Sequence, residues 1–312
     1  MGHLLTPIRG NCRVISASLL SAGKLNTNYK VLLEGRDQAL VLRVYTNDPI
    51  ACERDAALYQ LMMDKVPLAP MLYHARSGHG LDHPYAVFEW VSGVLLSEVL
   101  DQGNADDILG VAQSAGGVLA AINQFRFDLP GFLGVNLEYT KTSSSATASF
   151  RDYLAEVERS GRAATRTGRS EFDRMIRFID DQIGCLAVVE TWYSLVHADY
   201  TGNNLIVRSE GGGWAVGAVL DWEFAMAGTS IFDVGVFLRN EDTLPSGFRS
   251  YFIRAFADAG GHLPAGWRRA SKLLDLINQF AFLDANGDYP NTFADATARI
   301  RTTITRWGEF RD

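Results

Sequence analysis

Apolar and β-branched residues form two short runs near the start of the chain. The runs lie at 29–34 and 39–45, within the segment NYKVLLEGRDQALVLRVY, and a Gly-Arg-Asp turn at 35–37 separates them. Two β-rich runs joined by a short turn that contains glycine predict a β-hairpin. A further apolar run, YAVFEWV at 85–91, predicts a buried strand.

A helical pattern separates the hairpin from this strand. The apolar residues of ERDAALYQLMM recur at helical spacing and predict a helix over about 49–64. Asp48 suits the N-cap of this helix, and Pro49 suits its first turn. Hairpin, helix and strand together predict a small α+β lobe over 1–91, followed by a second lobe over 92–312.

The second lobe has a predominantly helical pattern. Helices are predicted over 105–123, 147–159, 171–188, 247–258, 265–284 and 292–307. Short β-rich segments occupy 194–224 between these helices. Four arginines between 159 and 169 have helical spacing, but Gly161 and Gly168 interrupt them. We therefore expect a solvated loop or a frayed helix there, and no anion site.

The composition and the net charge limit the classes of binding partner that the protein is expected to have. The chain has 312 residues, of which 47% are hydrophobic, and a net charge of −7. The acidic balance argues against nucleic acid as the main partner, and no apolar run is long enough to predict a membrane span. Residues 1–93 carry 9 Lys and Arg against 8 Asp and Glu, whereas 94–312 carry 20 against 28. An acidic second lobe would favour a cationic small molecule.

The cysteines indicate a reducing environment. Cys12, Cys52 and Cys185 are scattered and odd in number, which fits neither a disulfide framework nor a zinc site. The first residues contain no long apolar segment of the kind that directs secretion. We therefore expect a cytoplasmic protein. The sequence leaves the choice between a monomer and a homodimer open.

The segment LVHADYTGNNLIV, at 195–207, contains the first candidates for catalytic and metal-binding residues. It presents Asp199 and Asn204 in a short loop between two apolar runs. Phosphoryl transfer needs a carboxylate that orients the acceptor hydroxyl and takes its proton, and it needs oxygen ligands for Mg²⁺. Asp199 can supply the carboxylate, and Asn204 can offer its amide oxygen to the metal.

A second carboxylate follows at a matching position. In AVLDWEFAMAG a β-rich run ends at Asp221, which lies 22 residues after Asp199. A carboxylate at the end of a strand is well placed for Mg²⁺, which prefers oxygen ligands. Glu223 is a possible additional carboxylate. Two acidic residues that both follow β-rich runs predict a shared site.

The first lobe offers residues for binding phosphate. Gly23 precedes a predicted strand and could let the backbone approach phosphate oxygens. Arg43 lies on the next strand, where a cation can hold the α- and β-phosphates of a nucleotide. Glu53, on the following helix, could hold that cation.

With these segments in view, the chain resembles the aminoglycoside phosphotransferase and choline-kinase-like enzymes, which are small-molecule kinases related to protein kinases. The resemblance covers roughly residues 12–285. HADYTGNN is similar to the catalytic loop of the family, and LDWEFAMAGTSIFDVGVFLR to its metal-binding segment. GKLNTNYKV is similar to the phosphate loop, and VFEWVSG to the hinge between lobes. The resemblance implies an α+β, protein-kinase-like two-lobed fold.

The resemblance also implies roles for the candidate residues. Asp199 would be the catalytic carboxylate, Asn204 and Asp221 would bind Mg²⁺, and Arg43 would pair with Glu53 at the phosphates. The nucleotide would be ATP or GTP. The acceptor would be a hydroxyl group of a small molecule, which can be cationic.

Other residues would bind the nucleotide or brace the loop. The resemblance places Gly23 and Asn28 at the phosphates and the backbone from Glu89 to Val91 at the base. His197 and Asp233 would support the catalytic loop without touching substrate.

The sequence departs from the pattern of protein kinases in two places, which leaves alternative functions open. Arg43 stands where protein kinases carry lysine, and a planar guanidinium makes different contacts from an ammonium group. Trp222 and Glu223 stand where protein kinases carry Phe-Gly, so no activation switch is implied.

We consider three functions. The first is phosphorylation of an aminoglycoside-like antibiotic. The second is phosphorylation of a metabolite such as choline, homoserine or a sugar. The third, from another class, is a nucleotide-binding pseudokinase that acts as a regulatory module. Five acidic residues are candidates for acceptor contacts: Glu223, Glu241, Asp242, Asp284 and Asp288.

Overall fold

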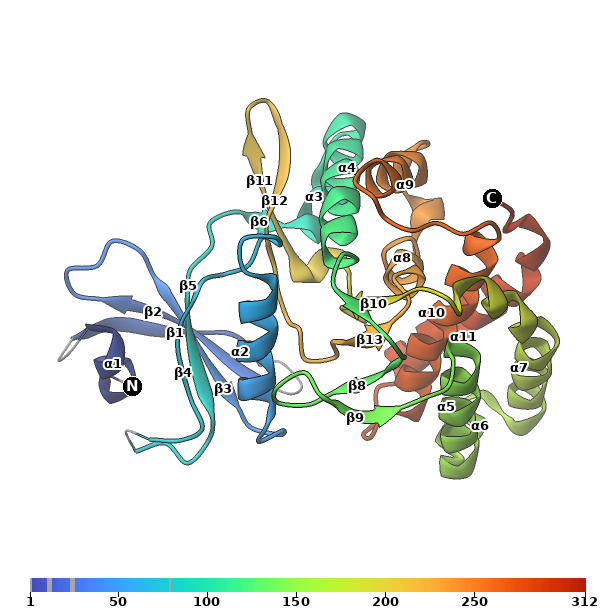
Figure 1. The fold of residues 1–312 in the computed structure, drawn as a ribbon, viewed down its shortest axis with the longest axis horizontal. Coiled ribbons are helices and arrows are strands. Elements are labelled where there is room, and N and C mark those ends of the chain that lie inside the picture. Colours follow the sequence, from blue (N-terminus) through green and yellow to red (C-terminus); the bar gives the residue numbers. More distant parts are fainter. Residues whose placement is uncertain (1, 10–12, 23–25, 79) are drawn as a thin grey trace.

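The computed structural model describes all residues except 1, 10–12, 23–25 and 79. Figure 1 shows a sheet lobe beside a larger helical lobe. The sheet lobe contains β1 to β5 with α2, and the helical lobe contains α3 to α11 with two smaller sheets. Gly23 and Cys12 lie outside the described residues. The predicted boundary at residue 91 stays a prediction.

Five antiparallel strands form the sheet of the first lobe, in the order β1-β2-β3-β5-β4. The strands are β1 (Val14–Ala22), β2 (Asn26–Leu33), β3 (Leu40–Tyr45), β4 (Met71–Ala75) and β5 (Tyr85–Glu89). The predicted hairpin is confirmed, because β2 and β3 pair antiparallel across the turn. Two buried clusters, one including Leu4 and Leu5 and the other including Ala51 and Cys52, pack with the sheet residues.

The helix after the hairpin begins later than predicted. α2 spans Ala51–Met62, and its N-cap is Ile50, two residues after Asp48. The Asp48 side chain still participates, because its Oδ1 accepts a hydrogen bond of 3.1 Å from the Ile50 backbone N–H. The carboxylate therefore satisfies a donor just before the helix instead of occupying the cap itself.

The helical lobe confirms the predicted helices to within a few residues. The short elements before and between the longer helices are β6 (Val94–Leu95), α3 (Leu96–Gln102) and α6 (Arg162–Thr167). The longer helices are α4 (Ala105–Ile122), α5 (Ala146–Ser160), α7 (Arg169–Gln182), α9 (Phe248–Asp258), α10 (Trp267–Asp284) and α11 (Pro290–Thr305). The predicted helix over 171–188 continues beyond α7 only as a 3₁₀ segment, Ile183–Val189.

The arginine-rich stretch is a correction to the sequence prediction. Residues 162–167 form the short helix α6 where we expected a solvated loop or a frayed helix, and its arginines are bound within the lobe instead of being solvated. Arg162 Nε donates to the Asp284 carbonyl at 2.6 Å, and Arg166 Nη1 donates to the Leu283 carbonyl at 2.6 Å. Carbonyl groups at a helix C-terminus lack intrahelical donors, so these guanidinium groups cap α10. The sequence spacing could not reveal that this helix end lies nearby.

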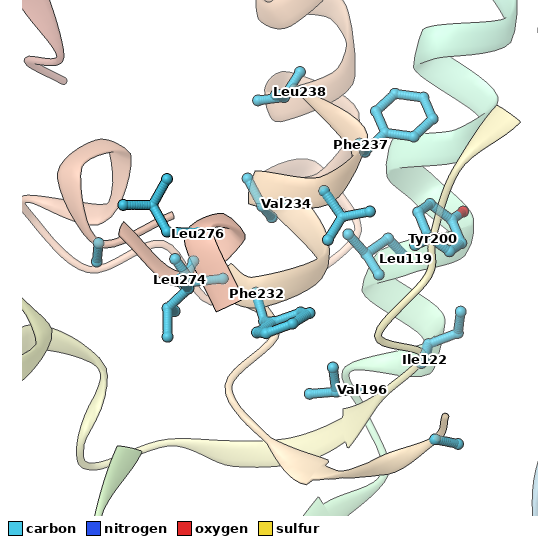
Figure 2. Packing of buried hydrophobic residues seen from close by; sticks show 14 of the residues in the cluster. Leu119, Ile122, Val196, Tyr200, Phe232, Val234, Phe237, Leu238, Leu274 and Leu276 are labelled. Atoms are coloured by element: carbon cyan, nitrogen blue, oxygen red, sulfur yellow. The ribbon is translucent and has the colours of Figure 1, made fainter. Parts of the chain in front are cut away.

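Two small sheets and one buried helix form the centre of the helical lobe. The sheets have the orders β7-β10-β13-β8-β9 and β12-β11-β6. Their further strands are β7 (Arg126–Phe127), β8 (Gly131–Leu133), β9 (Tyr139–Thr142), β10 (Tyr193–Val196), β11 (Leu205–Glu210), β12 (Gly213–Val219) and β13 (Met226–Gly228). All residues of α8 (Ile231–Phe237) are buried. Figure 2 shows Val234 and Phe237 packed between residues of α4 and α10.

A glycine allows α4 and α9 to approach closely, and it provides a test of the packing. A Cβ on Gly116 would lie 2.2 Å from the Phe252 carbonyl oxygen, whereas one on Gly117 would meet nothing within 4 Å. We expect Gly116→Ala to destabilise the protein by about 1–3 kcal/mol through overpacking. Gly117→Ala should stabilise it by up to about 1 kcal/mol, because alanine favours helix. Urea unfolding measures both, and equal effects would contradict the close approach.

Candidate active site

The loop after β10 is held by a buried carboxylate. Asp233, in the first turn of α8, accepts hydrogen bonds from the backbone N–H of His197 at 2.8 Å and of Ala198 at 2.9 Å. Burial raises the pKa of Asp233 to about 7, although both hydrogen bonds favour the ionised form. The carboxylate therefore fixes the direction in which the chain leaves the strand.

His197 joins this loop to the segment before Asp221. Its Nδ1 accepts from the Asp199 backbone N–H at 3.2 Å, so its proton is on Nε2, which lies 2.7 Å from the Leu220 carbonyl oxygen. The ring is fully buried, and burial lowers its pKa. His197 is therefore a neutral brace between the two chemistry-bearing segments, in the position that the resemblance implied.

This neutral histidine predicts a pH-dependent stability. The unfolded chain takes up a proton near pH 6.5 while the buried ring stays neutral, so its contribution is present above pH 6.5 and is lost below. We expect His197→Gln to be less stable than wild type at pH 7.5. The gap should narrow as the pH falls to 5.5, because the unfolded chain then gains a proton that the buried ring resists. Guanidinium unfolding at both pH values measures this, and a constant gap would contradict a neutral buried ring.

Asp199 and Asn204 form a directly bonded pair. Asn204 Nδ2 donates to Asp199 Oδ2 at 2.8 Å and to the Asp199 carbonyl at 2.9 Å. Because the amide nitrogen is used in this way, the Asn204 Oδ1 is turned to the other side and has no hydrogen bond within the described residues. Ala198, just before Asp199, has a φ of 67°, a left-handed conformation that costs free energy for a residue with a Cβ.

Asp221 lies beside this pair. The backbone N–H of Leu220 donates to the Asn204 carbonyl at 2.8 Å, which places the two segments side by side. Asp221 also has a left-handed backbone, with a φ of 63°, and its side chain is 37% exposed. The structure therefore brings together Asp199, Asn204 and Asp221 from two segments of the chain.

Arg43 connects the sheet lobe to this group. Its Nε donates to Asn28 Oδ1 at 3.0 Å, and its two terminal nitrogens lie 3.5 Å from Asp55 Oδ2 and 3.3 Å from Asp221 Oδ1. The neighbouring carboxylates help to hold the pKa of Arg43 above its usual range despite burial. The guanidinium thus stays charged between the two lobes.

The predicted pairing of Arg43 with Glu53 is wrong. Glu53 instead forms an ion pair with Arg76, with Arg76 Nη2 and Glu53 Oε2 at 2.7 Å. Helical geometry explains the difference, because residues two positions apart on a helix point in different directions. Asp55 faces the sheet together with buried Cys52, three residues earlier, whereas Glu53 faces Arg76 near the surface.

Asp55 is the residue that sequence reasoning missed. Its side chain is fully buried, and it accepts a hydrogen bond of 2.8 Å from the Tyr45 hydroxyl. Burial raises its pKa, and the charge of Arg43 opposes that effect. The signal in the sequence was an acidic residue on the apolar face of a predicted helix, three residues after Cys52. Such a residue needs a buried partner.

The sheet lobe also contacts the segment around Glu223. Asn26 Nδ2 donates to Glu223 Oε2 at 2.7 Å, and Arg54 Nη2 donates to the Glu223 carbonyl at 3.1 Å. Burial and the nearby charge of Asp221 raise the pKa of Glu223 to about 7. Together with the contact of Arg43 to Asp221, these bonds fix the segment that carries Asp221 to three elements of the sheet lobe.

The connection between the lobes includes Glu89, Trp90 and Val91, the residues that we predicted to bind the base. The Glu89 backbone N–H donates to Pro70, and its carboxylate pairs with Arg36 at 3.2 Å. The backbone N–H and C=O of Trp90 are both hydrogen-bonded. Val91 is next, and within the described residues its backbone groups have no hydrogen bond. Of the predicted base-binding residues, Val91 therefore retains a free donor and a free acceptor.

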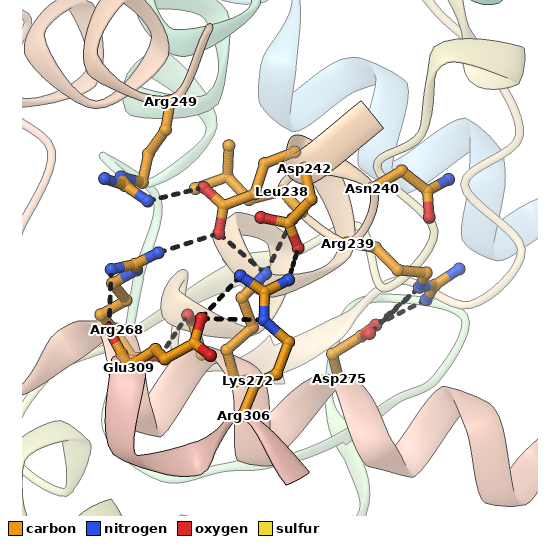
Figure 3. Close-up of polar contacts among 12 residues, drawn as sticks. Leu238, Arg239, Asn240, Asp242, Arg249, Arg268, Lys272, Asp275, Arg306 and Glu309 are labelled. Carbon is orange, nitrogen blue, oxygen red and sulfur yellow. Dashed lines mark hydrogen bonds and ion pairs between the residues drawn. The ribbon is translucent and has the colours of Figure 1, made fainter. Parts of the chain in front are cut away.

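Three of the five acidic residues proposed for acceptor contacts are occupied elsewhere. Glu241 is buried and lies 3.1 Å from Arg249, 3.4 Å from Arg268 and 3.1 Å from Lys272. Asp242 pairs with Arg306 (Figure 3), and Asp284 pairs with Arg162, in each case inside the helical lobe. These three carboxylates stabilise the packing of the helical lobe. Fewer acidic residues are therefore available to bind an acceptor than the sequence suggested.

The predicted metal would find oxygen ligands here but no cluster of acidic and histidine residues. Among the described residues, no group of three or more His, Cys, Asp or Glu is arranged to hold a metal. Asn204 Oδ1 and the carboxylate of Asp221, which also lies 3.3 Å from Arg43, can offer oxygens to such a metal. Mg²⁺ is commonly bound by one or two carboxylates together with substrate phosphates, so the donor set fits a metal that arrives with a nucleotide.

In the same described part of the chain, no helix is both long and apolar enough to cross a bilayer.

Several solved structures share the fold of the chain. One is a thermostable mutant of aminoglycoside phosphotransferase APH(4)-Ia in ternary complex with AMP-PNP and hygromycin B, with 19% identity, 97% coverage of both chains and a TM-score of 0.69. A second is the GDP complex of an aminoglycoside 2′-phosphotransferase-IIIa mutant, with 13% identity, 98% and 97% coverage and a TM-score of 0.71. A putative aminoglycoside phosphotransferase from Ralstonia eutropha has 17% identity, 99% and 97% coverage and a TM-score of 0.66.

These similarities confirm the protein-kinase-like fold that the sequence predicted. A search of curated proteins found no match. The model of the phosphotransferase enzyme family, in contrast, matches residues 16–273, which is most of the chain and includes both segments of the site. The chain belongs to the phosphotransferase enzyme family.

Proposed function

We propose that the protein transfers the γ-phosphoryl group of ATP or GTP to a hydroxyl group of a small molecule. The observation that carries this proposal is the meeting of Asp199, Asn204 and Asp221 from two segments, with Arg43 reaching them from the other lobe. Phosphoryl transfer depends on positioning and electrostatic stabilisation more than on covalent chemistry, and these four side chains supply both.

Asp199 is the general base of the proposed reaction. Its Oδ2 is bonded to Asn204, which fixes the carboxylate and leaves the Oδ1 to accept a hydrogen bond from the acceptor hydroxyl. The acceptor oxygen attacks the γ-phosphorus as the bond from that phosphorus to the bridging oxygen breaks. The hydroxyl proton passes to Asp199, and the nucleoside diphosphate leaves with the bridging oxygen.

The nucleotide would lie between the lobes. Arg43 and Asn28 would contact its phosphates, and the free backbone groups of Val91 would bind the base. Asn204 Oδ1 and Asp221 would hold Mg²⁺, which neutralises phosphate charge when bound. Related structures contain AMP-PNP, ADP or GDP, which supports a nucleotide site.

The acceptor that we place first is an aminoglycoside-like compound. In its favour, structural neighbours were solved with hygromycin B and with kanamycin. Choline, homoserine and sugars are the alternatives. Glu223 and Asp288 are the remaining acidic candidates for the acceptor, since the other three carboxylates are paired within the helical lobe. We further propose that the protein acts in the cytoplasm as a monomer or homodimer.

A coupled assay of nucleoside diphosphate release, ADP from ATP or GDP from GTP, tests this function. Kanamycin, hygromycin B, choline, homoserine and glucose would be offered to wild type with ATP or GTP in the presence of Mg²⁺. Turnover stimulated by one acceptor and lost in Asp199→Ala would establish the kinase and its substrate class. Nucleotide binding with no stimulation by any acceptor would instead favour a nucleotide-binding regulatory module.

A further inference from the structure

One face of α10 lies against the catalytic loop. Asp275 and Gln279 are buried on this face, and Asp275 binds Arg239 through Oδ1 at 2.6 and 3.0 Å. Asn278 is three residues after Asp275, so it occupies the same side of the helix one turn on. Its Nδ2 donates to the Ala198 carbonyl at 3.3 Å. α10 therefore contacts the residue directly before Asp199.

This contact fixes a strained peptide group. Ala198 is the left-handed residue of the loop, and its N–H is already bound by Asp233. Asn278 binds the carbonyl of the same residue, so the Ala198 backbone is held at both of its polar groups. The orientation of Asp199, the next residue, depends on both contacts.

The second polar atom of Asn278 is uncommitted. A carbonyl oxygen can only accept a hydrogen bond, so the amide group that contacts Ala198 must present its nitrogen. The Oδ1 of Asn278 therefore points elsewhere, and within the described residues it has no hydrogen-bond partner. The side chain is only partly buried, which leaves this oxygen open to a ligand.

We propose that Asn278 Oδ1 accepts a hydrogen bond from the acceptor molecule. This inference rests on the proposed function. Asn278 Nδ2 binds the carbonyl of Ala198, the residue directly before the proposed base Asp199, so the amide lies at the loop that the acceptor hydroxyl must approach. Asn278 Oδ1 can only accept a hydrogen bond, so an acceptor molecule that uses it needs a hydrogen-bond donor besides the reacting hydroxyl.

Kinetics of three variants would test this contact. Asn278→Leu removes both polar atoms, Asn278→Asp keeps an oxygen but loses the donor to Ala198, and Asn291→Leu changes an exposed amide on α11 as a control. The probe is whichever acceptor of the assay above gives the highest turnover. We expect Asn278→Leu to raise the acceptor KM about five- to tenfold, which corresponds to one hydrogen bond. The nucleotide KM should stay within twofold.

The aspartate variant separates binding from positioning. Asn278→Asp should keep the acceptor KM within about threefold while kcat falls, because the Ala198 carbonyl loses its donor. Competition between ethanolamine and choline provides a second measurement, because the amine of ethanolamine is a hydrogen-bond donor that choline lacks. Wild type should prefer ethanolamine, and Asn278→Leu should lose that preference.

Other outcomes would overturn the inference. An unchanged acceptor KM in a folded Asn278→Leu variant, with activity still dependent on Asp199, would remove the acceptor contact and leave the proposed function intact. A fall in kcat alone in that variant would reduce Asn278 to a support of Ala198. If wild type shows no acceptor-stimulated turnover, the proposed function fails and this inference fails with it.

Discussion

Replacement of Asp199 by alanine or asparagine is expected to reduce acceptor-dependent ADP release by about 10²–10⁴-fold, the usual contribution of a general base. Asp199→Asn is the sharper variant, because it keeps the shape of the side chain and cannot take the acceptor proton. Asp199 is only partly buried, so we expect little change in the midpoint of thermal unfolding. Initial rates at saturating nucleotide and acceptor give the measurement.

A matched carboxylate provides the control for this prediction. Asp288 is exposed and is a remaining candidate for acceptor contact. Asp288→Asn should change the acceptor KM at most, with kcat close to wild type. Retention of kcat in a folded Asp199→Asn protein would remove Asp199 from the role of base.

Replacement of Arg43 by methionine is expected to cost about 3–5 kcal/mol of the free energy of unfolding, because it leaves a buried charge unpaired. That charge belongs to Asp55, which is fully buried. The double variant Arg43→Met with Asp55→Leu removes both charges and should recover much of the loss. Guanidinium unfolding of the single and double variants measures this, and both should lose nucleotide affinity.

Glu53 is the control that separates the two possible partners of Arg43. Glu53 pairs with Arg76, whose side chain is 75% exposed, and surface pairs of this kind contribute little. Glu53→Gln should therefore change the free energy of unfolding by no more than about 0.5 kcal/mol. A large loss in this variant, with a small one in Asp55→Asn, would restore the pairing predicted from the sequence and contradict the structure.

Local patterns in the sequence were sufficient to predict most of the fold. The hairpin of β2 and β3 depends on two apolar runs and a turn that contains glycine, all within twenty residues. Each long helix carries its own apolar stripe, so its existence can be predicted without knowledge of its neighbours. The positions at which helices start were predicted less accurately. α2 begins after Ile50 and not at Pro49, because the side chain of Asp48 contacts the backbone from outside the helix.

The sequence also determined the family and the order of the candidate chemistry, since Asp199, Asn204 and Asp221 lie in two short segments with strong local signals. Only the tertiary structure decided which side chains meet across the chain. It paired Arg43 with Asp55, placed Arg162 at the end of α10, and surrounded Glu241 with three cations. The physical reason is that a charge takes its partner from whatever the packing brings near it, and spacing along one segment does not contain that information.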